Sequence, residues 1–374
     1  MARPKRPALK ERDLRGFKYF KLLMPLLKRL HRIGTARDKA GHRELFFDGY
    51  VSLLLLYFFN PIVTGLRGLQ QATGLNKVQR VLGIGRTSLG SLSEASSVFT
   101  AHSLRAIVQE LAQYALPLQR GREAEALHNL CAVDGTILTA LPKMTWALWK
   151  KKHHAVKMHL HFEVFKGVPA DATLTPAACS EPAQLQAMLQ PGRLYVTDRG
   201  YASFKLFDAI VKAGSSFVGR VKDNVRFGVV RERPLTDADR AAGVIRDVEL
   251  CRVGRRRGRE TLRRHWRLVI VRRTKPDGTI ETLYLMTNCL DLSADLIAVA
   301  YRYRWTVEMS HPDYFSSARL YRGGWAAYNQ HSCASAAGAL VPGTVQRIAR
   351  RAIMSDAHVA VPPRAPSRGS LCGR

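Results

Sequence analysis

The stretch that decides the fold is Leu130-Cys-Ala-Val-Asp-Gly-Thr-Ile-Leu138, an apolar run interrupted by one aspartate. A short apolar run with β-branched residues predicts a buried strand, which Asp134 would close. Leu194-Tyr-Val-Thr-Asp-Arg-Gly-Tyr201 has the same form, with Asp198 at the end of a second strand. The chain carries a formal charge of +30, so carboxylates at the ends of buried strands are poor candidates for solubility residues. We therefore expect Asp134 and Asp198 to be functional.

The surrounding sequence predicts a mixed α/β layer. Val156–Phe162 alternates apolar and polar residues, which predicts a strand with one buried face and one polar face. Arg193–Thr197 is the strand that leads to Asp198. Ser203–Ala213 carries apolar residues on one helical face and is followed by Gly214, a helix-stop signal. Strands that alternate with helices indicate the α/β class.

Composition narrows the class of partner. The chain has 374 residues, enough for two or three domains, and its apolar content of 46% can fill hydrophobic cores. Lys and Arg number 59 against 29 Asp and Glu. This excess favours a protein that works on nucleic acid over a merely basic or ribosomal protein. The six cysteines are scattered without a CxxC pair, which predicts a reduced, cytoplasmic protein.

The N-terminal part of the sequence divides in two. Residues 1–45 are rich in Arg and Lys and are interpreted as a solvated basic arm with a short amphipathic helix around Phe17–Leu30. Residues 46–120 are predicted to form a helical domain, in which the very apolar run Val51–Phe59 is a buried helix. This run is far shorter than the roughly 20 residues of a membrane span, so no membrane partner is expected. The domain serves either packing or the binding of DNA ends, and the sequence leaves both open.

A β-rich segment is predicted at residues 215–290. Three runs in it have strand character: Phe217–Val221, Trp266–Arg273 and Thr279–Thr287. Arg220 and Lys222 lie at the end of the first run and are either phosphate contacts or part of a solvated strand edge. The basic run Cys251–Arg259 is either a loop that grips phosphate or a solvated hairpin.

A helix is predicted to start near Ser293 and to carry a third carboxylate. Four residues fall on one face of this helix because they are spaced by 4, 3 and 4 positions: Ile297, Tyr301, Arg304 and Glu308. On its own the pattern would indicate an ordinary Arg304–Glu308 surface pair worth a few tenths of a kcal/mol. Beside two aspartates at strand ends, it indicates a functional Glu308.

Three carboxylates brought together would suit a divalent metal. Mg²⁺ is a hard ion held by a few carboxylate oxygens together with water and phosphate oxygens. Two ions about 3.5–4 Å apart can activate the attacking oxygen and stabilise the leaving oxygen of a phosphodiester. Zinc is disfavoured, because no cysteine or further histidine cluster completes a site around His159 and His161.

The chain resembles the DDE transposases of bacterial insertion sequences from roughly residue 45 to Glu308. The resemblance lies in the ordered set Asp134-Gly-Thr136, Asp198-Arg-Gly-Tyr201 and Tyr301-x2-Arg304-x3-Glu308. It is greatest to the insertion-sequence-four branch, which has a Y-(2)-R-(3)-E-(6)-K signature. The resemblance implies an RNase H-like, mixed-sheet catalytic core in two parts, residues 121–214 and 291–310. The β-rich insertion would interrupt this core, and the helical domain would precede it.

The resemblance also implies roles for the matching residues. Asp134, Asp198 and Glu308 would be the catalytic ligands of two Mg²⁺ ions, for which Mn²⁺ can substitute. DNA contacts are expected from residues near the cleaved end: Tyr301, Arg304, Arg199, Tyr201, Arg220 and Lys222. The reaction would be hydrolysis at the ends of the element, followed by attack of the freed 3′-OH on target DNA. The implied partners are terminal inverted repeats, target DNA and a second copy of the chain in a synaptic homodimer.

The sequence departs from this family pattern directly after Glu308. Phe315 stands where the signature has its Lys, and Pro312 would remove a helical hydrogen bond beside Glu308 at a cost of about 3 kcal/mol. Residues 311–374 form a basic tail with little periodicity, interpreted as frameshifted sequence or as a naturally disordered tail. Two alternatives to an active transposase follow: a catalytically dead DNA-binding remnant, and an RNase H-like nuclease without strand transfer.

Overall fold

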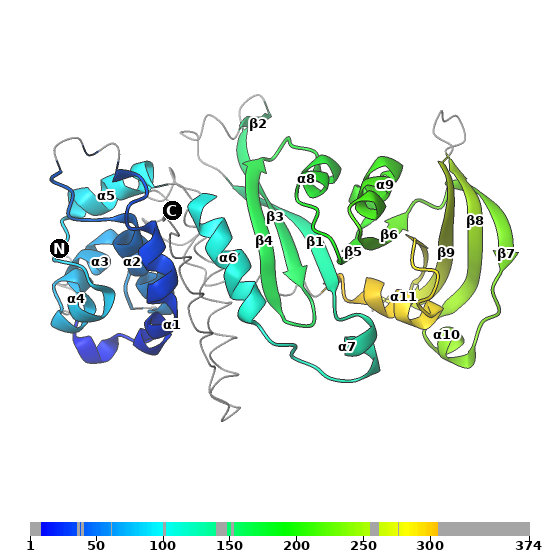
Figure 1. Cartoon of the computed structure of the whole chain (residues 1–374), viewed down its shortest axis with the longest axis horizontal. Coiled ribbons are helices and arrows are strands. Elements are labelled where there is room, and N and C mark those ends of the chain that lie inside the picture. The colour runs from blue at the N-terminus through cyan, green and yellow to red at the C-terminus, as the bar shows by residue number, and fades with distance from the viewer. Residues whose placement is uncertain are drawn as a thin grey trace, which may run out of the picture.

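The computed structural model describes residues 9–35, 38, 41–60, 62–99, 102–139, 148–150, 153–254, 262–275 and 277–305. A group of helices lies at one end of the molecule, and a large sheet with helices on both faces makes up the rest (Figure 1). Glu308, the predicted tail and most of the basic run at 251–259 lie outside the described residues. Within the described part, no helix is both long enough and apolar enough to cross a membrane.

The N-terminal helices share one core around an apolar helix. α2 is buried along nearly its whole length because it carries apolar residues on every side, which confirms the buried helix predicted there. α1 presents Phe20, Leu23 and Leu27 to the same core. The amphipathic helix predicted around Phe17–Leu30 is therefore present with its apolar face in this core, and the wider basic arm at residues 1–45 stays a prediction. The elements are η1 (Glu11–Asp13), α1 (Phe17–Leu27), η2 (Lys28–Leu30), α2 (Phe47–Phe59), α3 (Gly65–Thr73), α4 (Asn76–Leu82), α5 (Leu89–Val98) and α6 (His102–Tyr114).

The described strands form one ten-stranded mixed sheet with the order β2-β3-β1-β5-β6-β10-β9-β8-β7, and β4 pairs with β3. β1, β5 and β6 are parallel neighbours, whereas β3 and β4 are antiparallel. This arrangement confirms the predicted α/β class and is that of an RNase H-like core. The strands are β1 (Leu130–Thr139), β2 (Leu148–Lys150), β3 (His153–Glu163), β4 (Val168–Pro176), β5 (Leu194–Thr197), β6 (Ser216–Val221), β7 (Arg226–Glu232), β8 (Val244–Gly254), β9 (Leu262–Thr274) and β10 (Ile280–Thr287).

Helices cover both faces of this sheet. α8 and α9 lie on one face, while α11 lies on the other face and α6 runs beside β4 (Figure 1). Ser203 caps α9 by accepting a hydrogen bond from the amide of Leu206, which confirms the helix start predicted at this serine. The remaining helices are α7 (Arg122–Ala126), α8 (Glu181–Ala187), η5 (Arg199–Tyr201), α9 (Phe204–Lys212), α10 (Asp237–Ala241) and α11 (Ala294–Arg302).

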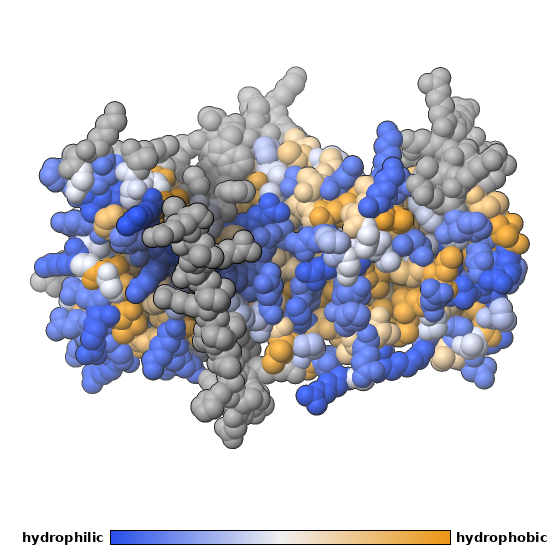
Figure 2. All heavy atoms as spheres, in the orientation of Figure 1, coloured by the Kyte–Doolittle hydropathy of each residue, from blue (hydrophilic) through white to orange (hydrophobic). Residues whose placement is uncertain are grey.

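Strand alternation divides the core residues between the two faces. Ala132 of β1 and Val196 of β5 belong to the hydrophobic cluster that includes Tyr301 of α11 and extends to the N-terminal helices. Cys131 and Tyr195, one position earlier in each strand, belong to the cluster beneath α8 and α9. We call the side of the sheet that carries the first cluster the α11 face, and the side that carries the second cluster the α8 face. Hydrophilic residues dominate the helical end of the surface, and apolar residues are more visible over the sheet region (Figure 2).

The strand predicted at residues 156–162 is present as part of β3, and its polar face is buried as well as its apolar face. Lys157 is 9% exposed, and His159 and His161 are each 3% exposed. They point to the α8 face, where α8 packs against β3. The polar groups are accommodated by internal partners, since Lys157 pairs with Glu181 and His159 bonds to Thr175.

The predicted insertion at residues 215–290 does not form a separate layer. β6 is a parallel neighbour of β5 within the core sheet, and β10 pairs with β6 in antiparallel fashion. β9, β8 and β7 then extend the same sheet outward. The three predicted strands are present, and the segment adds β7 and β8 to them.

Candidate active site on neighbouring parallel strands

Asp134 lies within β1, and Asp198 directly follows β5, the parallel neighbour of β1. The register pairs Cys131 with Tyr195 and Ala132 with Val196, where the printed pairing of the two strands ends. Alternation from Ala132 directs Asp134 toward the α11 face. The charges of both aspartates act on Tyr201, so both lie in its neighbourhood. Their convergence on one metal site stays a prediction.

The two aspartates are oriented by local hydrogen bonds. The Thr136 hydroxyl donates to Asp134 Oδ2 at 3.0 Å, and the Gly200 amide donates to Asp198 Oδ1 at 2.8 Å. Asp198 follows β5 and caps η5, as the sequence predicted for a strand end. Asp134 differs from the prediction, because β1 continues to Thr139 and the aspartate lies within the strand. Both side chains are partly exposed and can meet a ligand.

A third acidic residue, Glu181, lies beside this pair and was missed by the sequence analysis. Its Oε1 atom is 2.8 Å from Lys157 Nζ. Its Oε1 and Oε2 atoms lie 2.9 Å and 3.3 Å from the points where Cβ atoms would stand at Gly135 and Gly200. Glu181 is the first residue of α8, after Ser180 at the N-cap. An acid in a first turn is ordinary helix chemistry, so the sequence carried no signal that set it apart.

The pKa values of Tyr201 and His159 are shifted by burial and by the charges around them. Burial raises the pKa of the Tyr201 phenol well above its usual value, and Glu181, Asp134 and Asp198 raise it further. Burial lowers the pKa of His159 to about 4, and the positive charge of Lys157 contributes in the same direction. Tyr201 is 3% exposed, so it lies at the base of the site and not on the surface where a DNA contact was predicted.

α11 lies on the face toward which Asp134 is directed. The helix begins after Ser293, as predicted, and Ile297 and Tyr301 pack into the cluster that contains Val196. Tyr301 is 3% exposed and Arg304 is 4% exposed, with the Arg304 guanidinium 4.2 Å from the centre of the Trp305 ring. Both residues are thus interior in this structure. The convergence of Glu308 with the aspartates stays a prediction, because Glu308 lies outside the described residues.

The other residues predicted to contact DNA fall into two groups. Arg199 and Lys222 are exposed. Arg220 is instead engaged within the sheet, because its guanidinium donates to Glu281 Oε1 at 2.7 Å. Arg273 shares the same carboxylate of Glu281.

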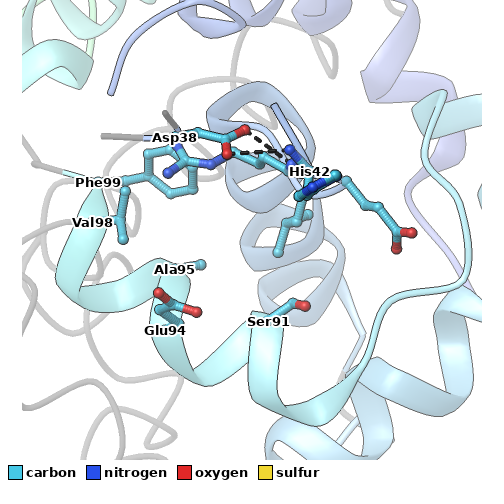
Figure 3. Close-up of a pocket in the computed structure, with 10 residues that line it drawn as sticks. Asp38, His42, Ser91, Glu94, Ala95, Val98 and Phe99 are labelled. Carbon is cyan, nitrogen blue, oxygen red and sulfur yellow. Dashed lines mark hydrogen bonds between the residues drawn. The ribbon is translucent and has the colours of Figure 1, made fainter. Parts of the chain in front are cut away.

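Two cavities in the described part of the chain do not involve the aspartates. A cavity of about 340 Å³ lies in the helical end, where Asp38 accepts hydrogen bonds from the amides of His42 and Arg43 (Figure 3). Another, of about 390 Å³, lies near the start of β5 and β6 and is lined by Asn129 and Asn288. Neither is lined by Asp134 or Asp198, and both of these aspartates are partly exposed.

The donor set fits a hard divalent ion. Asp134 and Asp198 offer carboxylate oxygens, which Mg²⁺ and Mn²⁺ prefer. Among the described residues, no group of three or more His, Cys, Asp or Glu is arranged to hold a metal ion. A complete centre therefore requires a further ligand, for which Glu308 is the predicted residue.

The sheet order, the acidic residues Asp134 and Asp198 in or directly after adjacent parallel strands, and the strongly basic chain are together typical of proteins that process nucleic acids. The family model described as "Transposase DDE domain" matches residues 125–316, about half of the chain. The chain belongs to this family. The matched segment contains both aspartates, α11, Glu308 and Pro312.

Two curated relatives agree with this family. One is a transposase for insertion sequence element IS5377 of Geobacillus stearothermophilus, 27% identical over 181 residues, which are 48% of this chain and 46% of the relative. The other is the transposase y4zB of Sinorhizobium fredii, 29% identical over 196 residues, which are 52% of this chain and 53% of the relative. The chain thus spans about half the length of the curated relatives it matches. The predicted family is confirmed, and the predicted branch stays a prediction.

A solved structure was also matched, a cryo-EM structure of the piggyBac transposase synaptic complex with hairpin DNA. The sequence identity is 10% and the TM-score is 0.44, over 92% of this chain and 77% of that chain.

Proposed function

We propose that this chain is a transposase that cuts DNA at the ends of an insertion sequence and joins the freed ends to target DNA. The proposal is supported above all by the parallel pairing of β1, which carries Asp134, with β5, which leads directly to Asp198. Membership of the DDE transposase family supports it. Such an enzyme would work in the cytoplasm, where its DNA substrates lie.

Asp134, Asp198 and Glu308 would hold divalent metal, with Mg²⁺ as the expected ion and Mn²⁺ as a substitute. Bound ions would activate the attacking oxygen and stabilise the leaving oxygen of the phosphodiester. The protein supplies orientation: Thr136 and the Gly200 amide fix the rotamers of the two aspartates before substrate arrives. Asp134 within β1 and Asp198 at the end of β5 would be held on rigid backbone, which suits a reaction that depends on geometry.

DNA would be held by exposed cations around the site. Arg199 follows Asp198 directly, and Lys222 follows β6, the next parallel strand. Tyr301 and Arg304 are interior, so we assign them to holding α11 against the sheet and not to contact with DNA in this conformation. A homodimer that pairs two DNA ends is part of the proposal.

We further propose that activity is reduced by the sequence after Glu308. Pro312 disfavours a continuous helix beside the third carboxylate, and Phe315 replaces a cation of the family signature. The variant Pro312→Ala/Phe315→Lys should therefore cut DNA faster than the natural chain.

Cleavage of a labelled duplex that carries the terminal repeats flanking the gene tests this function. With Mg²⁺, the natural chain or the rebuilt variant should release a 3′-OH end and join it to a supercoiled target plasmid. Asp134→Asn and Asp198→Asn should each lower the rate by at least about 100-fold while DNA binding is retained. The control Glu232→Gln alters an exposed carboxylate of β7 and should leave the rate unchanged.

Three outcomes are decisive for the proposal. Cleavage that survives either aspartate substitution would show that the site lies elsewhere. Cleavage without joining would identify a nuclease. DNA binding without cleavage by both the natural chain and the rebuilt variant would identify a DNA-binding remnant.

A further inference from the structure

Each aspartate of the site is followed by a glycine whose backbone does not require one. Gly135 follows Asp134 directly, and Gly200 stands two positions after Asp198. Neither glycine has a positive φ, so alanine could adopt either backbone conformation. The reason for a glycine must therefore be space and not flexibility.

Glu181 occupies the space that both glycines leave open. A Cβ atom at Gly135 would stand 2.9 Å from Glu181 Oε1 and 3.0 Å from its carboxyl carbon. A Cβ atom at Gly200 would stand 3.3 Å from Glu181 Oε2 and 3.1 Å from Asp198 Oδ1. One carboxylate therefore lies against the backbone beside both aspartates.

This carboxylate is held in place. Lys157 reaches it from β3 with a contact of 2.8 Å, and the side chains of Lys157 and Glu181 are 11% and 24% exposed. Lys157 Nζ also lies 3.5 Å from the carbonyl oxygen of Cys179, just before α8. Since Glu181 belongs to α8 and lies over Gly135 of β1, the pair links β3 to α8 across the strand that carries Asp134.

One buried polar atom near this carboxylate lacks a hydrogen-bond partner among the described residues. His159 is 3% exposed and lies opposite Gly135 in the β1–β3 register, and its Nδ1 atom has no partner in the described residues. Buried polar atoms usually have partners, so this atom indicates a place for a water or a ligand oxygen. Tyr201 is 3% exposed, and the charges of Glu181, Asp134 and Asp198 raise its pKa further above its usual value.

We propose that Glu181 is a positioning residue of the active site, locked by Lys157 against Gly135 and Gly200. It packs from the α8 face against the backbone at Gly135 and Gly200 and so holds the chain segments that carry Asp134 and Asp198, and its charge adds to the attraction of the site for a divalent cation. It acts through the aspartates and not as a ligand, in the manner of the outer residues that orient metal-binding side chains. The inference rests on the proposed function, since it assumes that the aspartates bind a cation.

Glu181→Gln keeps the size of the side chain and removes its charge. Outer residues of metal sites typically contribute about 10- to 100-fold to metal affinity, so the Mg²⁺ concentration for half-maximal cleavage should rise by about that factor. Gly135→Ala should have a similar effect, because the new methyl group displaces the locked carboxylate. The double variant should be no worse than the more damaging single variant, because both act through one group. Gly85→Ala is the matched control, since a Cβ atom there meets nothing within 4 Å.

Mn²⁺ binding by the full chain without DNA, followed by electron paramagnetic resonance, gives a readout that does not depend on activity. Both site variants should bind Mn²⁺ about 10- to 100-fold more weakly while the thermal midpoint without metal stays within a few degrees of the natural chain. Additive effects of Gly135→Ala and Glu181→Gln, or natural Mn²⁺ affinity in both, would overturn the inference and leave the proposed function standing. A natural chain that binds no Mn²⁺ would overturn both.

Discussion

Removal of one carboxylate from the outer part of the sheet should destabilise the protein strongly. Asp247 of β8 and Arg267 of β9 form a buried ion pair, with Arg267 1% exposed and Asp247 3% exposed. Arg267 donates to the two oxygens of Asp247 at 2.7 Å and 2.6 Å. It also donates to carbonyl groups at Cys289 and Leu292, in the segment directly before α11. The substitution Asp247→Ala leaves this guanidinium buried beside carbonyl groups alone.

The expected loss of unfolding free energy follows from the burial of the Asp247–Arg267 pair. Breaking a buried ion pair by removing one partner typically costs about 3–5 kcal/mol, because the remaining charge is uncompensated. Arg233 lies 3.7 Å from the same carboxylate but keeps Glu249 at 3.1 Å, so the expected loss comes mainly from Arg267. The double variant Asp247→Leu/Arg267→Met should lose less than Asp247→Ala alone, because no charge then remains buried in the pair.

Urea unfolding followed by far-ultraviolet circular dichroism and by tryptophan fluorescence measures this loss. Trp266, one of the five tryptophans, is 2% exposed and adjoins Arg267. The control Glu232→Ala breaks the exposed Arg246–Glu232 pair and should cost less than about 1 kcal/mol. A loss for Asp247→Ala no larger than that of the control would refute the assignment of Arg267 as a buried, charge-dependent link to α11.

Two further predictions concern DNA binding and pH. Arg199→Gln and Lys222→Gln should each reduce the slope of log affinity for DNA against log salt concentration by about 1, because each removes one exposed cation. Filter binding or fluorescence anisotropy at several salt concentrations would measure this slope. An unchanged slope would exclude a phosphate contact by the substituted residue. Burial lowers the pKa of His161 to about 4, so between about pH 6.5 and 4 the unfolded chain binds a proton that the folded chain does not. Stability should therefore fall as the pH drops, by about 2 kcal/mol from His161 at pH 5, and unfolding at pH 7 and pH 5 should show a smaller difference for His161→Gln.

Local patterns were enough to predict the elements that frame the site. The apolar runs before Asp134 and Asp198 became β1 and β5, and the one-sided helix after Ser203 became α9. Their proximity could be expected because an apolar run buried on both faces is typical of parallel neighbours in an α/β sheet. The register in which β1 and β5 pair required the structure.

The sequence analysis failed where polar residues are buried by distant parts of the chain. Lys157 and His159 alternate with apolar residues, a pattern that is typical of a solvated strand face. They are buried instead because α8 supplies Glu181 to Lys157 and β4 supplies Thr175 to His159. The periodicity of a sequence shows which residues are polar and does not show which residues pair with them. The pair of Lys157 and Glu181 could therefore not be predicted from it.

The partners of the carboxylates separate structural from functional acids in this chain. Asp171, Glu163 and Asp247 are buried, and each is held by an arginine, at 2.6 Å in all three cases. Asp198 is held instead by a neutral donor, the amide of Gly200. An incoming cation does not have to displace an arginine from an aspartate whose hydrogen-bond donor is a neutral amide, which is the property that a metal-dependent nuclease site requires.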